Sequence, residues 1–340
     1  MTDMKKALTA FFKDIDKHDV ATAGGKGANL GEMWRNKFPV PNGFAVTTHA
    51  YDIFLDENQL AKKIKAILKD VDVSDSKELD SASKMARREI MNSKMPEVVA
   101  REIIFSYKKL SGLFKSSLVA VRSSATAEDL PGMSFAGQQA TFLNIKGEAN
   151  LLQSVRECWA SLFTSRAMFY RHENKIATEK VKISVIVQKM VQSVVSGVMF
   201  TIDPVTNEKD RIVIEAVWGL GEMIVQGSVV PDRYVVQKDT FSILSKEVSD
   251  QSVQLIRVGE TTKEVEVPKE IRSKAKISEA EVVKLAKIAQ RLQQHYYFPQ
   301  DIEWAKENRD LFITQTRPVT TMAKVALGRT LKLNDKDVRF

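Results

Sequence analysis

The chain has 340 residues, of which 44% are hydrophobic and 28% charged, the composition of a folded globular protein large enough for about two domains. Its 51 basic and 43 acidic residues give a net charge of +8. The two signs are mixed along the chain, which argues against a basic arm or stripe for binding nucleic acid. The single cysteine, Cys158, excludes an internal disulfide framework and favours a reducing compartment.

The sequence predicts no contact with membranes. Residues 1–14 are charged and lack the apolar centre of a signal peptide. The most apolar stretch, residues 183–200, is interrupted by Gln188, Lys189 and Gln192, so no window approaches the roughly 20 apolar residues that span a bilayer. We therefore expect a cytoplasmic protein.

A predicted helix over Lys5–Lys17 is followed by a glycine-rich segment, Ala23–Met33, in which Lys26 lies among glycines. Glycine-rich backbone at the start of a helix forms an anion site, and a lysine adds a mobile cation. The segment is not a Walker A loop, because Gly27 stands where that motif requires serine or threonine. A helix cap with an exposed lysine is the alternative.

A short strand over Phe44–Thr47 precedes a charged helical region. Thr48 is expected to cap the first helix, near His49. No residues suited to catalysis cluster in this region, which is predicted to contain four helices: Tyr51–Leu55, Ala61–Lys69, Lys77–Asn92 and Glu97–Leu110.

The apolar run Val119–Val121 predicts a buried strand that delivers Arg122 to a loop of small residues. A guanidinium binds phosphate oxygens with two parallel hydrogen bonds. Gly137, further along the loop, would let backbone N–H groups approach the same ligand closely. The sequence here indicates an anion-binding loop, with an exposed hairpin that carries an edge arginine as the alternative.

A strand over Ala140–Ile145 and two helices, Glu148–Leu162 and Ser165–Asn174, come next. Val181–Met190 is then predicted to be an apolar strand that leads from one subdomain into another. Backbone groups at such a crossing can face a flat base, with Gln188 beside them. A plain central strand explains the same pattern.

The second half of the chain is predicted to be rich in antiparallel strands, followed by one long helix. Ser278 and Glu281 form a capping box at the start of that helix, Glu279–His295. The expected strands are Gly197–Thr201 and Ile212–Val217, followed by a meander of Tyr234–Val236, Phe241–Leu244 and Val253–Val258.

Two closing strands form a predicted hairpin around a turn at residues 308–310. Because side chains alternate along a strand, Asp301 and Glu303 share one face, and Gln315 and Arg317 share a face of the second strand. Carboxylate and amide oxygens suit Mg²⁺, which keeps phosphates and waters as its other ligands. An adjacent arginine can stabilise a phosphoryl group in transfer. A polar pairing on a solvated sheet face is the alternative.

Taken together, five short motifs resemble the N-terminal nucleotide-binding domain of phosphoenolpyruvate synthases; pyruvate phosphate dikinases and rifamycin phosphotransferases are similar. The resemblance covers about residues 20–321. The motifs, in the order found in that family, are Gly24–Gly31, Val121–Asp129, Ser134–Gln139, Ser196–Thr201 and Gln315–Arg317.

The resemblance implies an α+β fold of the ATP-grasp type, in which two subdomains clasp ATP between them. The first subdomain would comprise residues 1–190 and the second residues 191–321. Residues 322–340 would form a tail or linker.

The resemblance also implies roles for individual residues. Lys26 and Arg122 would neutralise the ATP phosphates, and the loop from Gly137 to Thr141 would close over them. Gln188, with the backbone at Met190, would contact the adenine.

In the second subdomain, Glu303 and Gln315 would be the Mg²⁺ ligands. Arg317 would hold the phosphoryl group in transfer, and Asp301 would be a lesser member of this set. The implied cofactors are therefore ATP and Mg²⁺.

Members of this family pass a phosphoryl group from ATP to a histidine on a swivelling domain, and a third domain then delivers it to the acceptor. None of the four histidines of this chain matches such a site, so we expect both domains to act in cis or in trans from outside these 340 residues. The main interpretation is thus the ATP-binding, phosphoryl-donating domain of a pyruvate, water dikinase. The alternatives are the same domain of a rifamycin phosphotransferase and a nucleotide-binding module without turnover.

Overall fold

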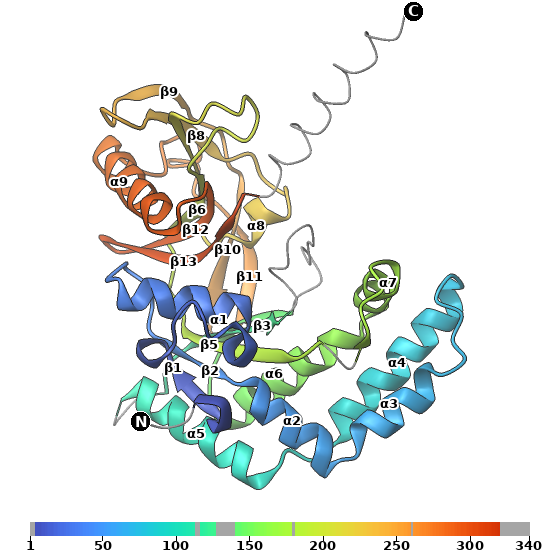
Figure 1. Cartoon of the computed structure of the whole chain (residues 1–340). Coiled ribbons are helices and arrows are strands. Elements are labelled where there is room, and N and C mark those ends of the chain that lie inside the picture. Colours follow the sequence, from blue (N-terminus) through green and yellow to red (C-terminus); the bar gives the residue numbers. More distant parts are fainter. Residues whose placement is uncertain (1–3, 113–115, 127–139, 179–180, 260, 320–340) are drawn as a thin grey trace, which may run out of the picture. The chain divides into compact units, whose positions relative to one another are not determined.

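The computed structural model describes residues 4–112, 116–126, 140–178, 181–259 and 261–319. It combines helices with antiparallel sheets, which confirms the predicted α+β class (Figure 1). The chain forms two compact units. One comprises Met1–Met190 and Arg257–Thr262, and the other Val191–Ile256 and Lys263–Phe340.

The first unit is built on a five-stranded sheet in which every neighbouring pair is antiparallel. The strands, in their order across the sheet, are β1 (Thr9–Phe11), β2 (Gly43–Val46), β5 (Ile183–Lys189), β3 (Val119–Ala125) and β4 (Thr141–Ile145).

Helices cover both faces of this sheet (Figure 1). Helix α1 (Val20–Arg35) packs on one face, against β2, β3 and β5. The large apolar core lies on the other face, where the rings of Phe54 and Trp159 are 4.6 Å apart. The helices that enclose this core are α2 (Thr48–Glu57), α3 (Leu60–Leu68), α4 (Ser76–Asn92), α5 (Glu97–Ser111), α6 (Glu148–Ala160) and α7 (Ser165–Glu173).

The predicted helix over Lys5–Lys17 is wrong. This segment instead forms two 3₁₀ turns, η1 (Met4–Lys6) and η2 (Phe12–Asp14), on either side of strand β1. Strand β1 extends the sheet at β2, and the ring of Phe11 packs 5.7 Å from that of Phe44. Tertiary pairing at the sheet edge has overridden the local helical pattern.

The expected cap of α2 also shifts by one residue. Thr47, rather than Thr48, precedes the helix, and its hydroxyl accepts a hydrogen bond from the Ala50 N–H at 3.4 Å. Thr48 instead donates to the Ala21 carbonyl of α1 at 2.9 Å, which joins the two helices.

The second unit is built on a six-stranded antiparallel sheet, with α9 (Glu279–Tyr296) packed against β7, β8 and β12 (Figure 1). The strands, in their order across the sheet, are β13 (Asp310–Pro318), β12 (Gln300–Glu307), β6 (Val195–Phe200), β7 (Arg211–Trp218), β8 (Asp232–Gln237) and β9 (Ile243–Glu247). The capping box of Ser278 and Glu281 at the start of α9 is confirmed. Cys158 is buried in the first unit.

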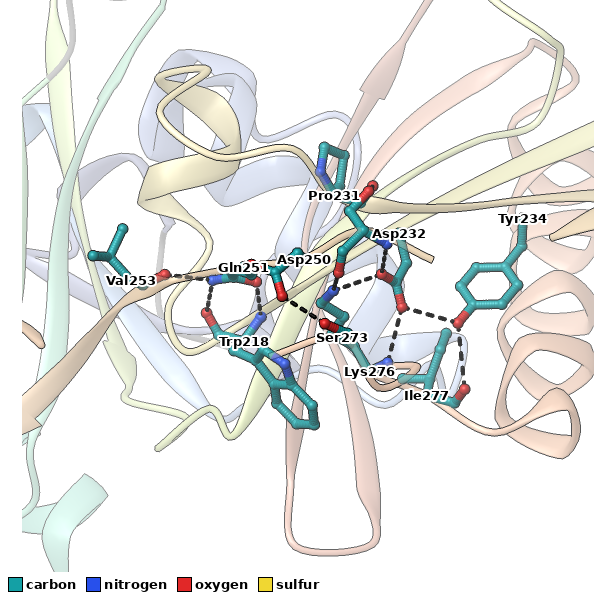
Figure 2. A network of polar contacts seen from close by, with 11 residues as sticks. Trp218, Pro231, Asp232, Tyr234, Asp250, Gln251, Val253, Ser273, Lys276 and Ile277 are labelled. Atoms are coloured by element: carbon teal, nitrogen blue, oxygen red, sulfur yellow. Dashed lines mark hydrogen bonds and ion pairs between the residues drawn. The ribbon is translucent and has the colours of Figure 1, made fainter. Parts of the chain in front are cut away.

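The predicted meander is wrong in its third strand. Strand β10 (Val253–Val258) does not join β9 but pairs with β11 (Thr261–Glu266), which the sequence analysis missed. The buried Gln251 diverts the chain just before β10. Its amide accepts from the Trp218 N–H at 2.8 Å and donates to the carbonyls of Trp218 at 3.1 Å and Val253 at 2.8 Å (Figure 2).

The loops around β10 and β11 are fixed by a buried ion pair that the sequence pattern did not indicate. Lys276 Nζ lies 2.6 Å from Asp232 Oδ1, and both side chains are fully buried (Figure 2). The Asp232 carboxylate also accepts from the Ser249 N–H at 3.0 Å and the Tyr234 hydroxyl at 3.2 Å. Burial and the neighbouring Asp232 raise the pKa of Tyr234 above its usual range, so this phenol stays protonated and can donate.

Among the described helices, none combines the length and the apolar composition needed to cross a bilayer.

We expect Lys276→Met to lower the free energy of unfolding by about 3–5 kcal/mol, because it leaves the buried Asp232 carboxylate without its counter-charge. Urea unfolding followed by tryptophan fluorescence measures this change. Lys246→Met is the matched control, since Lys246 pairs with Glu279 at 3.2 Å on the surface and should contribute less than about 1 kcal/mol. Equal losses in the two variants would contradict a special role for the buried pair.

Candidate functional site

In the first unit, Arg122 lies in the middle of β3, opposite Thr141 on β4 and Ile186 on β5. Residues paired across antiparallel strands point to the same face of a sheet. The structure therefore brings the predicted phosphate-binding residues Arg122 and Thr141 together. Thr141 is exposed, and Arg122 is half-buried.

Helix α1 places Lys26 over this same face. The helix is interrupted at Gly24, whose φ of 67° and ψ of 172° are not helical, so a new helical segment starts just before Lys26. A Cβ atom on Gly27 would lie 2.9 Å from Cδ1 of Ile186, the residue paired with Arg122. Lys26 itself is half-buried, which fits a side chain able to reach a ligand on this face.

The glycines around Lys26 have a packing role in addition to the predicted anion cradle. Cβ atoms added to Gly24, Gly27 and Gly31 would lie 2.2 Å from Ser124 Oγ on β3, 2.9 Å from Ile186 Cδ1 on β5 and 2.6 Å from Ile15 Cβ before the helix. All three contacts are shorter than real Cβ atoms make, so these glycines are needed for α1 to approach the sheet and the segment before it. The Gly27 N–H donates to Ser124 Oγ at 3.4 Å rather than toward a ligand.

The predicted adenine contacts lie at the end of β5. Gln188 is paired with Ala120 and Gly43, is buried, and donates from Nε2 to the Pro41 carbonyl at 3.2 Å. The Met190 N–H donates to the Leu118 carbonyl at 2.9 Å. A base at this edge would therefore have to use the Met190 carbonyl or the Gln188 side-chain oxygen, and the adenine role of these residues stays a prediction.

Gly137 and the loop before Thr141 lie outside the described residues, so their predicted role in covering the phosphates has no structural account here. The same holds for the predicted tail over residues 322–340.

In the second unit, the β12–β13 hairpin brings all four predicted residues together. Asp301 is paired with Arg317, and Glu303 with Gln315, so the four side chains form two adjacent cross-strand pairs on one face. Arg317 Nε and Nη2 each lie 2.8 Å from Asp301 Oδ2. The turn predicted at residues 308–310 is also present. Glu307 is paired with Asp310, and Asn308 lies in the left-handed region at φ 55°.

The second unit adds charged residues that the sequence analysis missed. Asp301 is opposite Phe200 on β6, which is opposite Val213 on β7, and Glu215 lies two residues further along β7 on the same face. Arg233 on β8 is paired with Glu215. The available signal was a lone carboxylate within an otherwise apolar strand.

Arg233 is anchored beside this face by a buried carboxylate. Its Nη2 lies 3.0 Å from Asp203 Oδ2, while Asp203 Oδ1 accepts from the N–H groups of Val205 and Thr206 at 2.8 and 3.2 Å. The guanidinium is thus fixed in place, ready to oppose negative charge at Glu215.

The two carboxylates Glu215 and Asp301 on this face are poorly solvated. Burial raises the pKa of Glu215, against the opposing effect of Arg233, and the Asp301 charge adds to the increase. Burial likewise raises the pKa of Asp301, although the Arg317 guanidinium opposes it. Carboxylates that are poorly solvated and close to each other are stabilised by an added positive charge.

The side-chain oxygens on this face are too few to hold Mg²⁺ by themselves. Glu303 and Gln315 place a carboxylate and an amide oxygen side by side, which are ligands that Mg²⁺ accepts. Over the described ranges, no group of three or more His, Cys, Asp or Glu residues is arranged to hold a metal. Phosphate and water oxygens would therefore have to complete the coordination shell.

Comparison with known proteins identifies the family. Residues 20–336 match the family described as pyruvate phosphate dikinase, AMP/ATP-binding domain. The chain is 47% identical over 324 residues to a probable phosphoenolpyruvate synthase of Methanothermobacter thermautotrophicus, covering 95% of this chain. It is 44% identical over 335 residues to a probable phosphoenolpyruvate synthase of Methanocaldococcus jannaschii, covering 97% of this chain.

These relatives are longer than the chain, which spans 47% of the length of the first and 28% of the second. A phosphoenolpyruvate synthase of Pyrococcus furiosus is 41% identical over 93% of this chain and 44% of its own length. The crystal structure of D-alanine-D-alanine ligase from Helicobacter pylori aligns with this chain at a TM-score of 0.31 and 9% identity. The alignment covers 72% of this chain and 55% of the ligase chain.

We expect Glu215→Gln to stabilise the protein relative to wild type at pH 7 but not at pH 4. The folded-state pKa of Glu215 is raised, so the wild-type carboxylate destabilises the fold once it ionises, and this effect is absent below the ordinary pKa of glutamate. Urea unfolding at the two pH values measures the difference. The surface variant Glu264→Gln is the control, and the same pH trend in both variants would contradict the role of burial at Glu215.

Proposed function

Because the chain belongs to the pyruvate phosphate dikinase AMP/ATP-binding domain family, we propose that it binds Mg²⁺-ATP and donates a phosphoryl group from it to a partner domain. The observation that carries this proposal is the register of β12 and β13, which sets Asp301 opposite Arg317 and Glu303 opposite Gln315. The same proposal includes the ATP-grasp fold, in which each of the two units corresponds to one subdomain. Its support is the family match together with two units of α+β structure.

The first unit would bind the polyphosphate. Lys26 supplies a flexible point charge and Arg122 a planar fork of donors, and the two lie over one face of the sheet with Thr141. Two cations of different shape can neutralise phosphates that are not equivalent in position. Gln188 and Met190 at the end of β5 would contact the base.

The second unit would hold the metal and the phosphoryl group in transfer. Glu303 and Gln315 are proposed as Mg²⁺ ligands, and the ion when bound would neutralise phosphate charge. Asp301 holds the Arg317 guanidinium in one orientation through its Nε and Nη2 atoms. A guanidinium has five N–H donors, so one that is oriented by a carboxylate can still donate to a phosphoryl oxygen.

The acceptor of the phosphoryl group would lie outside this chain. We propose a histidine on a swivelling domain, supplied by the same longer polypeptide or by a separate one, with a third domain that carries the final acceptor. The names of the relatives support pyruvate as that acceptor. A cytoplasmic location accompanies the proposal, because the phosphoryl donor is ATP and Cys158 is unpaired.

We expect Arg317→Ala to reduce phosphoryl transfer to a separately expressed histidine domain by about 100-fold or more, because the charge on the group in transfer loses its stabilising donor. ATP affinity should fall by less than about tenfold, since the first unit still binds the phosphates. Mass spectrometry of the phosphorylated histidine domain measures transfer, and calorimetry measures ATP binding. Arg309→Ala, at the exposed turn of the same hairpin, should transfer normally, and unchanged transfer by Arg317→Ala would refute the role.

We expect Glu303→Gln to weaken the dependence of ATP binding on Mg²⁺, because a neutral amide is a poorer ligand for a hard cation than a carboxylate. Titration calorimetry with ATP at several Mg²⁺ concentrations measures this effect. Glu307→Gln is the matched control on the same strand. Glu307 accepts a hydrogen bond from the Gln192 N–H at 3.2 Å, and the amide oxygen of glutamine can accept the same hydrogen bond. An unaltered Mg²⁺ titration of the Glu303 variant would remove this residue from the metal site.

A further inference from the structure

One buried side chain, Ser124, joins the Lys26 segment of α1 to the strand that carries Arg122. Its hydroxyl donates to the Ala23 carbonyl at 3.1 Å and accepts from the Gly27 N–H at 3.4 Å. These two backbone groups lie on either side of Lys26 in the sequence. Ser124 itself is two residues beyond Arg122 on β3 and shares its face of the sheet.

The break in α1 at Gly24 brings the helix into contact with this same serine. A Cβ atom at Gly24 would lie 2.2 Å from Ser124 Oγ and 2.3 Å from the Ser124 carbonyl oxygen. The φ of 67° at Gly24 also disfavours any other residue. The backbone just before Lys26 is thus held directly against β3, with no intervening side chain.

The position of Ser124 is fixed by its neighbours on the sheet. It is fully buried and is paired with Ser184 on β5. The Ser184 hydroxyl donates to the Val46 carbonyl at 2.9 Å, which links β5 to its other neighbour, β2. The Ser124 hydroxyl therefore has a defined position from which to hold α1.

We propose that Ser124 is a positioning residue for nucleotide phosphates, which sets the place of Lys26 relative to Arg122. The inference rests on the proposed function, since it assigns a role within the same phosphate site. A lysine loses conformational entropy when it binds a phosphate, and a fixed backbone limits that loss. Without the Ser124 hydroxyl, the Ala23 carbonyl and the Gly27 N–H lose a buried partner and the segment around Lys26 is no longer held.

The role predicts that the effect of Ser124 depends on the phosphates and on Lys26. Ser124→Ala should raise the Kd for ATP about tenfold and leave the Kd for adenosine unchanged, because adenosine has no phosphate to contact Lys26. In a Lys26→Ala background, Ser124→Ala should cause no further loss of ATP affinity. A general structural defect would weaken both ligands in both backgrounds.

The matched control is Ser123→Ala. Ser123 is the adjacent buried serine on β3, points to the opposite face, and its Oγ has no hydrogen-bond partner among the described residues. Ser123→Ala should therefore leave ATP affinity unchanged. Ser124→Cys serves as a second variant, because a thiol fills the same place but forms only weak hydrogen bonds. It should give an intermediate Kd, and it keeps the test available if the alanine variant fails to fold.

The experiment is calorimetric titration of the wild type and these variants with ATP and with adenosine, with thermal unfolding as a check on folding. A selective, Lys26-dependent loss of ATP affinity supports the inference. Equal losses for ATP and adenosine, or an undiminished loss in the Lys26→Ala background, would overturn it. A wild-type chain that binds no ATP would instead overturn the proposed function, and the positioning role with it.

Discussion

The close approach of α1 to the first sheet and to the segment before the helix is the contact on which the proposed phosphate-binding face depends. Gly24, Gly27 and Gly31 allow it, because a single Cβ atom at any of them would overlap a neighbouring atom. This approach brings Lys26 and Arg122 to the same face of the sheet and buries the Ser124 hydroxyl between the helix and the strand. The segment that packs closely on the sheet is therefore the same one that is proposed to bind the phosphates.

In the second unit, strand register rather than helix packing brings the charged side chains to one face. The antiparallel register of β12 and β13 sets Asp301 beside Arg317 and Glu303 beside Gln315, while β7 adds Glu215 to the same face. Charges on a partly buried sheet face are costly unless each has a counter-charge or a ligand. Arg317 and Arg233 supply counter-charge to Asp301 and Glu215, and Mg²⁺, when bound, would supply it to Glu303.

Local patterns predicted those parts of the molecule in which near neighbours in the sequence decide the structure. The capping box of Ser278 and Glu281 was correct because both of its hydrogen bonds lie within one turn. The helix expected over residues 5–17 was wrong because pairing with β2 at the sheet edge decided its conformation. The third strand of the meander was wrong because Gln251, bonded to the backbone at Trp218, directs the chain away from β9.

The sequence by itself determined most helices and the order of the motifs, since periodicity, caps and glycine spacing are local properties, and the resemblance carried by those motifs implied the α+β class. It also determined that Asp301 and Glu303 share a face, because side chains alternate along any strand. Only the tertiary structure decided that three glycines serve the packing of α1, that Glu215 joins the charged face, and that Lys276 and Asp232 form a buried pair. Each of these depends on two segments more than 15 residues apart meeting at atomic distance, and no local pattern encodes such a meeting.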